Sequence, residues 1–317
     1  MYANEGRNLI DSLVKSGGQH MMEKRVIKDA LAGRLMLLLT IFSGLVVFLM
    51  GIGLYARSRP ILAIKSLSEL LFSTSWHPLR KEFGFFPFIM GSLWVTGVAV
   101  IIAIPLCLLT TIFLSEYAPR YVRELAKPLI DLLAGIPSVV YGVWGVLVIV
   151  PLIKDYIAPL FGTFSTGYCV LAGGVVLAIM VFPIIIHVSS EVLASVPYEI
   201  REASLSLGAT KWQTIKHVVI RKAMPGIIAA VVLGLSRAFG ETMAVLMVAG
   251  NVAKAPSSIL DPAYPLPALI ANNYGEMLSV PLYDSALLLA CLVLLLVVLF
   301  FNIIARIVLI RVERGLQ

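Results

Sequence analysis

Charged residues are scarce in this 317-residue chain, and their scarcity narrows the class of protein at once. Asp, Glu, Lys and Arg make up 14% of the sequence, whereas 59% is hydrophobic, and the mean hydropathy is +0.95. Soluble domains are only about 45–50% apolar. The composition therefore predicts an integral membrane protein, in which each charge inside an apolar run is informative.

Motifs for metal binding, nucleophilic catalysis and nucleotide binding are also missing. Cys107, Cys169 and Cys291 lie in apolar runs without a CxxC spacing, which indicates small buried side chains. The four histidines have no metal-ligand spacing, and neither G-x-S-x-G nor G-x-x-x-x-G-K-[ST] occurs. We therefore expect no metal, no cofactor and no enzymatic activity in this chain. The net charge is +7, but the sequence has no run of basic residues. The distribution of its basic residues therefore fits membrane topology better than nucleic-acid binding.

Six apolar runs are long enough to cross a bilayer, which takes about 20 residues. They cover residues 31–55, 88–114, 128–153, 168–188, 224–250 and 284–310. The first run is too long for a signal peptide and no A-x-A site follows it, so we expect a retained first span. The predicted fold is an all-α membrane protein with six transmembrane helices.

Lysines and arginines are distributed unevenly around these runs. Most lie in the N-terminal arm, in the segments 115–127 and 189–223, and at the C-terminal end. Because basic residues concentrate on the cytoplasmic side of a membrane, we expect both termini in the cytoplasm. The predicted organisation is a cytoplasmic arm at 1–30, a six-span domain at 31–310 with an inner loop at 189–223, and a cytoplasmic tail at 311–317.

Two opposite charges interrupt the fifth run, in GLSRAFGETMAVLMVAG (234–250). Arg237 lies near the middle of the run and Glu241 follows four residues later, so a continuous helix places both on one face. The small residues Ala230, Gly234 and Ala244 share that face. Since small residues mark close helix contacts, we expect the two charges to face a protein interior or a cavity.

Two interpretations of this pair stay open. Arg237 and Glu241 neutralise each other and lock the helix bundle, or they border a solute pathway, where intramembrane ionisable groups usually belong. An arginine suits an anion with several oxygens, because its planar fork bonds two of them. In a transport cycle, Glu241 would hold Arg237 at rest and release it later.

The stretch AGIPSVVYGVWG (134–145) combines glycines with a proline inside the third run. Gly135 and Pro137 predict a kinked or broken helix there, because proline removes a helix hydrogen bond that a neighbour or a wet cavity must replace. The break lies either beside a pathway or at a bend that serves packing.

The inner loop 189–223 contains signals for two short helices at the membrane surface. Pro197 fits the first turn of the first helix, and Gly208 fits its left-handed cap. Thr210 and Gln213 form a capping box for the second helix. A tight break is therefore predicted between the two helices.

Part of this loop, REASLSLGATKWQTIKHVVI, resembles the EAA loop of ABC-importer permeases, which reads Glu-Ala-Ala, three residues, Gly and later Ile-x-Leu-Pro. Glu202, Ala203 and Gly208 match this pattern, Ser204 replaces the second alanine, and Arg221 stands where the family has proline. The resemblance implies a type I ABC importer permease fold. It also implies that this loop is the coupling helix, which docks on a cytoplasmic ATPase.

Two further stretches, LLAGIPSVVYGVWG (132–145) and SRAFGETMAVLMVAGN (236–251), are similar to the first permease subunit of phosphate importers, the PstC family. Together the resemblance covers about residues 31–310. It implies phosphate as the substrate, with Arg237 and Glu241 on its path. It also implies a PstA-like permease partner, two PstB-like ATPase subunits carrying ATP and Mg, and a PstS-like phosphate-binding protein outside the membrane.

Two alternatives remain at this point. One is an ABC permease for another oxyanion, such as sulfate or molybdate. The other is a stand-alone secondary transporter, which needs no ATPase and which the EAA-like loop disfavours.

Overall fold

The computed structural model describes residues 2–276 and 280–314, and the chain divides into two units, Met1–Ala56 and Arg57–Gln317. In the first unit the described residues belong to one helix, α1 (Tyr2–Leu62), so the described part of the arm at 1–30 is helical. From Leu31 the sequence of α1 is strongly apolar and its described side chains are mainly exposed, as in Leu38 and Phe42. Such a surface requires an apolar surrounding.

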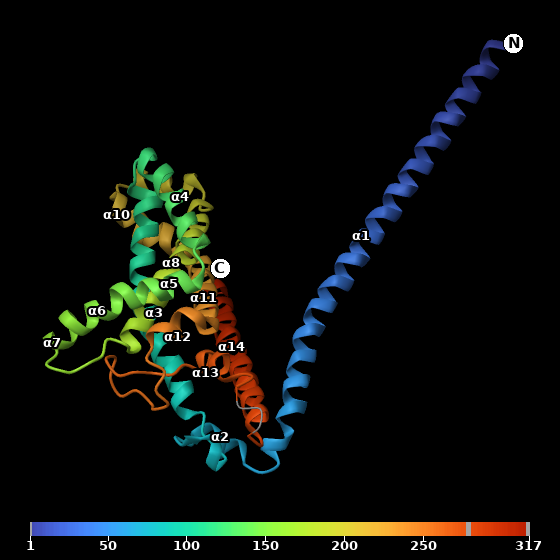
Figure 1. Ribbon diagram of the computed structural model, residues 1–317. Coiled ribbons are helices and arrows are strands. Elements are labelled where there is room, and N and C mark those ends of the chain that lie inside the picture. Colours follow the sequence, from blue (N-terminus) through green and yellow to red (C-terminus); the bar gives the residue numbers. More distant parts are fainter. Residues whose placement is uncertain (1, 277–279, 315–317) are drawn as a thin grey trace. The chain divides into compact units, whose positions relative to one another are not determined.

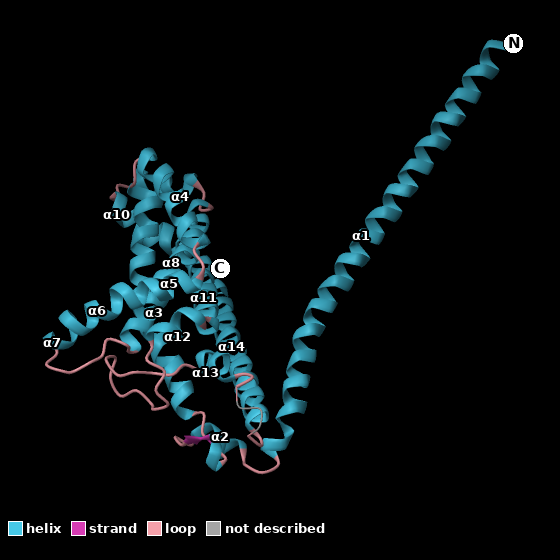
Figure 2. Ribbon diagram, in the orientation of Figure 1, coloured by secondary structure: helices cyan, strands magenta, loops and turns pink. Residues whose placement is uncertain are grey.

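The described residues of the second unit form helices, loops and one small two-stranded sheet (Figure 2). Its first half contains α2 (Leu67–Phe72), β1 (Trp76–His77), η1 (Pro78–Arg80), β2 (Glu82–Phe83), α3 (Phe86–Ile112), η2 (Phe113–Tyr117), α4 (Arg120–Gly135), α5 (Ser138–Trp144), η3 (Gly145–Ile149), α6 (Val150–Leu152), η4 (Ile153–Ile157) and α7 (Ala158–Leu160). Its second half contains α8 (Val170–Ala194), α9 (Tyr198–Ser206), α10 (Lys211–Thr214), η5 (Ile215–Val219), α11 (Ile220–Gly240), α12 (Met243–Val248), α13 (Leu266–Asn273) and α14 (Tyr283–Arg314). The segments η2 to η5 are π-helical turns that continue the neighbouring helices.

Six helical segments in the described residues are long and apolar enough to cross a membrane, which confirms the predicted number. They are Leu31–Leu62, Phe86–Tyr117, Ser138–Leu160, Val170–Ala194, Lys211–Gly240 and Tyr283–Val308. The predicted third and fifth spans, 128–153 and 224–250, had wrong boundaries. In both cases a helix break falls inside the apolar run, and hydrophobicity alone does not reveal where it lies.

Helices α3, α8, α11 and α14 pack in sequence beside one another and form the centre of the second unit (Figure 1). Glycines permit the close approaches. A β-carbon at Gly234 of α11 would lie 2.6 Å from Ile185 Cγ1 of α8. A β-carbon at Gly173 of α8 would lie 3.1 Å from Val95 Cγ1 of α3. Small residues thus set the helix spacing, as expected where helices associate in an apolar medium.

At the end of the second unit opposite α4 and α10 lie α2 and the two-stranded sheet (Figures 1 and 2), and aromatic side chains pack around that sheet. Strands β1 and β2 pair antiparallel with Trp76 opposite Phe83, and the Trp76 ring also packs against Phe88 and Tyr283. The loop after α12 is fixed to the start of α8, because Val170 N donates to Asp261 O over 2.9 Å. These contacts hold the sheet against α3 and α14 and the loop against α8.

Candidate functional site

The predicted pair of charges lies at a helix break rather than on one continuous helix. Arg237 is in the last turn of α11, which ends at Gly240, and Glu241 has extended backbone angles of φ −71° and ψ 127°. The Glu241 carboxylate accepts a hydrogen bond of 3.3 Å from Ala244 N, near the start of α12. Within the described residues no ion pair joins Arg237 to Glu241. The expected placement of the pair on a single helix face was therefore wrong.

The orientation of Arg237 also differs from the expectation. Ala230, Gly234 and Ala238 are buried in the packed core of the second unit, whereas Arg237 is exposed. At about 100° per residue, each four-residue step from Ala230 to Gly234 and on to Ala238 changes the direction of the side chain by only about 40°. The three-residue step from Gly234 to Arg237 changes it by about 60° in the opposite sense. The guanidinium consequently lies at the edge of the small-residue face and points away from the core of its own chain.

A second break lies where the glycine–proline stretch predicted one. Helix α4 ends at Gly135, Ile136 is extended with φ −70° and ψ 127°, and α5 begins at Ser138 after Pro137. Tyr141 bridges this break, because its hydroxyl donates a hydrogen bond of 2.7 Å to the Leu133 carbonyl. The same carbonyl also accepts a hydrogen bond of 3.4 Å from Ile136 N, so the Tyr141 hydroxyl adds a second bond at the end of α4.

The two breaks adjoin each other in space. Helix α5 packs on α12, and a β-carbon at Gly142 would lie 2.6 Å from Met247 Sδ and 3.2 Å from Ala244 Cα. Arg237 is close enough to Tyr141 for the two side chains to interact electrostatically. The junction therefore presents an exposed arginine, always charged and rich in N–H donors, between four helix ends. Chemically, such a group suits reversible contact with an oxyanion.

The inner loop has the predicted turn between its helices. Gly208 has φ +84°, Gly208 N donates to Leu205 O over 2.9 Å, and Ala209 N donates to Ser204 O over 3.3 Å. These bonds form a Schellman cap, which favours glycine because other residues are strained at positive φ. Thr210 and Gln213 form the predicted capping box at the start of α10.

The second helix of the loop is not a separate surface element, however. Helix α10 continues through η5 into α11, so Lys211–Gly240 is one helical segment of 30 residues. The family's proline position, occupied here by Arg221, lies inside this segment, and without a proline there the backbone hydrogen bonds continue. The expectation of two short helices at the membrane surface was correct only for α9.

The residues that match the EAA pattern lie on α9 and its cap. Glu202, Ala203 and Gly208 are exposed, whereas Ser204 is half-buried and its Oγ is hydrogen-bonded to Thr214 Oγ1 over 2.9 Å. Apolar side chains beside them are also exposed, including Leu207 at 90% and Trp212 at 50%. An apolar patch of this kind, rimmed by polar groups, is typical of a protein interaction surface.

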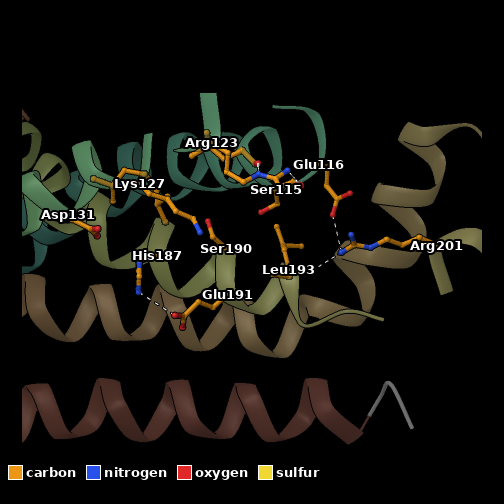
Figure 3. A pocket seen from close by; sticks show the side chains of 14 residues that line it. Ser115, Glu116, Arg123, Lys127, Asp131, His187, Ser190, Glu191, Leu193 and Arg201 are labelled. Carbon is orange, nitrogen blue, oxygen red and sulfur yellow. Dashed lines mark hydrogen bonds and ion pairs between the residues drawn. The ribbon is translucent and has the colours of Figure 1, made fainter. Parts of the chain in front are cut away.

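A cleft of about 450 Å³ lies between the end of α3 and helices α4, α8 and α9 (Figure 3). Its charged side chains come from all sides: Glu116, Arg123, Lys127, Asp131, His187, Glu191 and Arg201. Sequence reasoning did not find this cleft. The four-residue spacing of Arg123, Lys127 and Asp131 on one face of α4 was its only visible signal.

Comparisons with known proteins agree with this architecture. Residues 108–314 match the protein family described as "Binding-protein-dependent transport system inner membrane component". The phosphate transport system permease protein PstC of Xylella fastidiosa (strain 9a5c) is 39% identical over 270 residues, which cover 81% of this chain and 82% of that protein. The probable ABC transporter permease protein YqgH of Bacillus subtilis (strain 168) is 41% identical over 240 residues, which cover 75% and 76%.

Solved structures with the same fold include a chain of a bacterial alginate ABC transporter, with a TM-score of 0.63 at 16% identity and coverage of 89% of this chain and 94% of that one. The MetNI methionine ABC transporter in an inward-facing conformation gives a TM-score of 0.54 at 19% identity, covering 70% and 93%. The predicted type I ABC importer permease fold is thereby confirmed.

Proposed function

Because the chain belongs to the family of binding-protein-dependent transport system inner membrane components, we propose that it is the permease subunit of an ATP-driven phosphate importer. It is a multi-pass protein of the inner membrane. The relatives named as phosphate permeases support phosphate as the substrate. The observation that carries the proposal is Arg237, a permanent cation exposed at the junction of two broken helices.

In this proposal, the exposed side chain of Arg237 faces the pathway between two permease subunits. A charge deep in the membrane is costly unless it meets a polar surrounding, and no ion pair within the described residues neutralises Arg237. A PstA-like partner subunit completes the pathway on the open side, so phosphate passes between the two subunits. Arg237 then contacts the anion briefly through its planar donors. Glu241, held at the start of α12, limits how tightly the anion binds.

In this proposal, ATP hydrolysis by partner subunits drives transport. The sequence has no nucleotide-binding loop, so ATP and Mg are carried by two PstB-like ATPase subunits. We assign their docking to the exposed surface of Glu202, Ala203, Ser204 and Gly208, on the cytoplasmic side with both termini. A PstS-like binding protein delivers phosphate at the opposite, aromatic-capped end.

The test is ATP-dependent uptake of labelled phosphate by the complete complex in liposomes, with sulfate and molybdate as competing labels. We expect phosphate uptake by the wild type, strong loss with Arg237→Gln and partial loss with Arg237→Lys, which keeps the charge but not the fork. Arg221→Gln is the matched control, since Arg221 is an exposed arginine of the same helix, away from the junction.

Two results would contradict the proposal. Preferred uptake of sulfate or molybdate would move the assignment to another oxyanion importer. Full phosphate uptake by an assembled Arg237→Gln complex would leave Arg237 with a structural role only.

A further inference from the structure

Two basic side chains of the inner loop contact the turn that follows α3 at its cytoplasmic end. Arg201 Nη2 of α9 lies 3.1 Å from Glu116 Oε1, and Lys211 Nζ of α10 lies over the Tyr117 ring, 4.6 Å from its centroid. Glu116 and Tyr117 are neighbours in the π-helical turn η2, which is the last turn of the second span. Figure 3 shows Arg201 reaching across to Glu116 at the edge of the cleft.

These two cations come from opposite sides of the Gly208 turn. Helix α9 carries Arg201 and the start of the fifth span carries Lys211, and the hydrogen bond between Ser204 and Thr214 joins the two helices. The two helices that flank the turn therefore both contact η2, α9 through Glu116 and α10 through Tyr117. A displacement of the turn must either break these contacts or move η2.

The Glu116–Arg201 pair is much less exposed than the Arg120–Glu124 pair near the start of α4. The side chains are 8% and 20% exposed, respectively, whereas those of the Arg120–Glu124 pair are 91% and 63% exposed. Exposed pairs contribute little, but removing one partner of a buried pair leaves an uncompensated charge. Arg201 is further fixed by the Leu193 carbonyl, to which its Nη2 donates over 2.8 Å.

The pair is also placed so that it can change its geometry. Arg201 Nε is buried, with no hydrogen-bond partner among the described residues, so the guanidinium is only partly satisfied. The cleft beside it, lined also by Ser115 and Ser190, leaves room for both side chains to shift. An unpartnered donor with free space beside it allows the pair to exchange hydrogen-bond partners.

We infer that the Glu116–Arg201 ion pair is a positioning contact that transmits movement of the inner loop to the second span. This inference rests on the proposed function, in which an ATPase moves that loop. Because η2 continues α3 without a break and α3 packs along α8, a shift of η2 carries the second span with it. The Lys211–Tyr117 contact supports the same path.

The test uses the complete complex in lipid nanodiscs and liposomes, with the variants Arg201→Gln and Glu116→Gln. A double variant, Arg201→Glu with Glu116→Arg, restores the attraction with the charges exchanged. Arg120→Gln is the matched control, because it removes an exposed ion pair. Two quantities are measured: phosphate taken up per ATP hydrolysed, and the nucleotide-dependent change in hydrogen–deuterium exchange at residues 108–117.

We expect each single variant to lower the uptake per ATP by about tenfold, within the range usual for coupling between sites. The exchange response at 108–117 should disappear while that at 198–214 remains, and the charge exchange should restore both quantities. Unchanged coupling in Arg201→Gln, or a double variant as impaired as the single ones, would overturn the inference. Wild-type complexes without phosphate uptake would instead refute the proposed substrate, and the exchange measurement would still decide the role of the pair.

Discussion

Ser236 and Asn302 join α11 to α14 by a hydrogen bond of 2.7 Å between the serine hydroxyl and the Asn302 side-chain oxygen. The bond lies one residue before Arg237, and the Asn302 amide donates in turn to the Val298 carbonyl over 2.8 Å. One turn further on, Phe239 stacks on Phe301 with ring centroids 4.5 Å apart. Arg237 therefore projects from a helix end whose rotation is fixed on two levels.

The first prediction concerns this polar contact within the membrane. Ser236→Ala should lower the free energy of unfolding by about 0.6 kcal/mol, the average for interhelical hydrogen bonds in membranes. Thermal unfolding in detergent, with Ser195→Ala as a control for an exposed serine hydroxyl, checks the value. A drop in phosphate uptake beyond that of the control would show that the rotation of α11 also matters for Arg237. An unfolding free energy equal to that of the wild type would contradict the stabilising role.

The second prediction concerns the left-handed turn at Gly208. A residue that disfavours positive φ should destabilise this turn by about 1–2 kcal/mol if it replaces Gly208. Gly208→Val should therefore weaken co-purification of the ATPase, while Gly208→Asn, which tolerates this conformation, should retain it. Membrane insertion, measured by protease protection, should be equal in both. Equal ATPase retention by the valine and asparagine variants would argue against the docking role of the turn.

The third prediction concerns the outer loop and pH. Asp261 Oδ2 accepts hydrogen bonds from Ser257 Oγ and from the backbone N–H groups of Ser257 and Ser258, over 2.8, 2.9 and 2.9 Å. The bond from the Ser257 hydroxyl is the main cause that lowers the pKa of Asp261 below its usual value. A lowered carboxyl pKa stabilises the folded loop fully above about pH 4, and this stabilisation is lost as the pH falls through the folded pKa.

Exchange of the Ser257 and Ser258 amides should therefore accelerate on acidification below about pH 4, after correction for intrinsic rates. In Asp261→Asn this acceleration below about pH 4 should be absent, because the amide oxygen still accepts hydrogen bonds but does not titrate. A wild-type loop whose protection does not change with acidification would contradict the assignment.

The sequence predicted the periodic and local features of this fold but not where helices stop within apolar runs. Six spans, the Gly208 turn and the Thr210 capping box depend on composition and on neighbouring residues, and all are present. The end of α11 at Gly240 is followed by α12, which packs on α5, and this contact between distant parts of the chain is not encoded in a short pattern. For the same reason the charges of Arg237 and Glu241 were assigned to one helix face.

The cleft beside α4 illustrates a further limit. Its lining combines residues that are far apart in the chain, such as Arg123 and Glu191, and only tertiary packing of α4 on α8 brings them together. Family resemblance helped more with function than with geometry. It pointed to Arg237 as a site residue, but the exposure of its side chain could be learned only from the structure.

The helical segment from Lys211 to Gly240, which contains the π-helical turn η5 and Pro225, links the Gly208 turn to Arg237. Lys211 follows the Gly208 turn, Arg237 lies near the other end, and about 26 residues at 1.5 Å each separate them by about 39 Å. A tilt of about 5° around the Lys211 end would sweep Arg237 through about 3 Å, roughly the length of a hydrogen bond. In the proposed function, such a tilt would make or break the contact between Arg237 and phosphate without a change of side-chain rotamer.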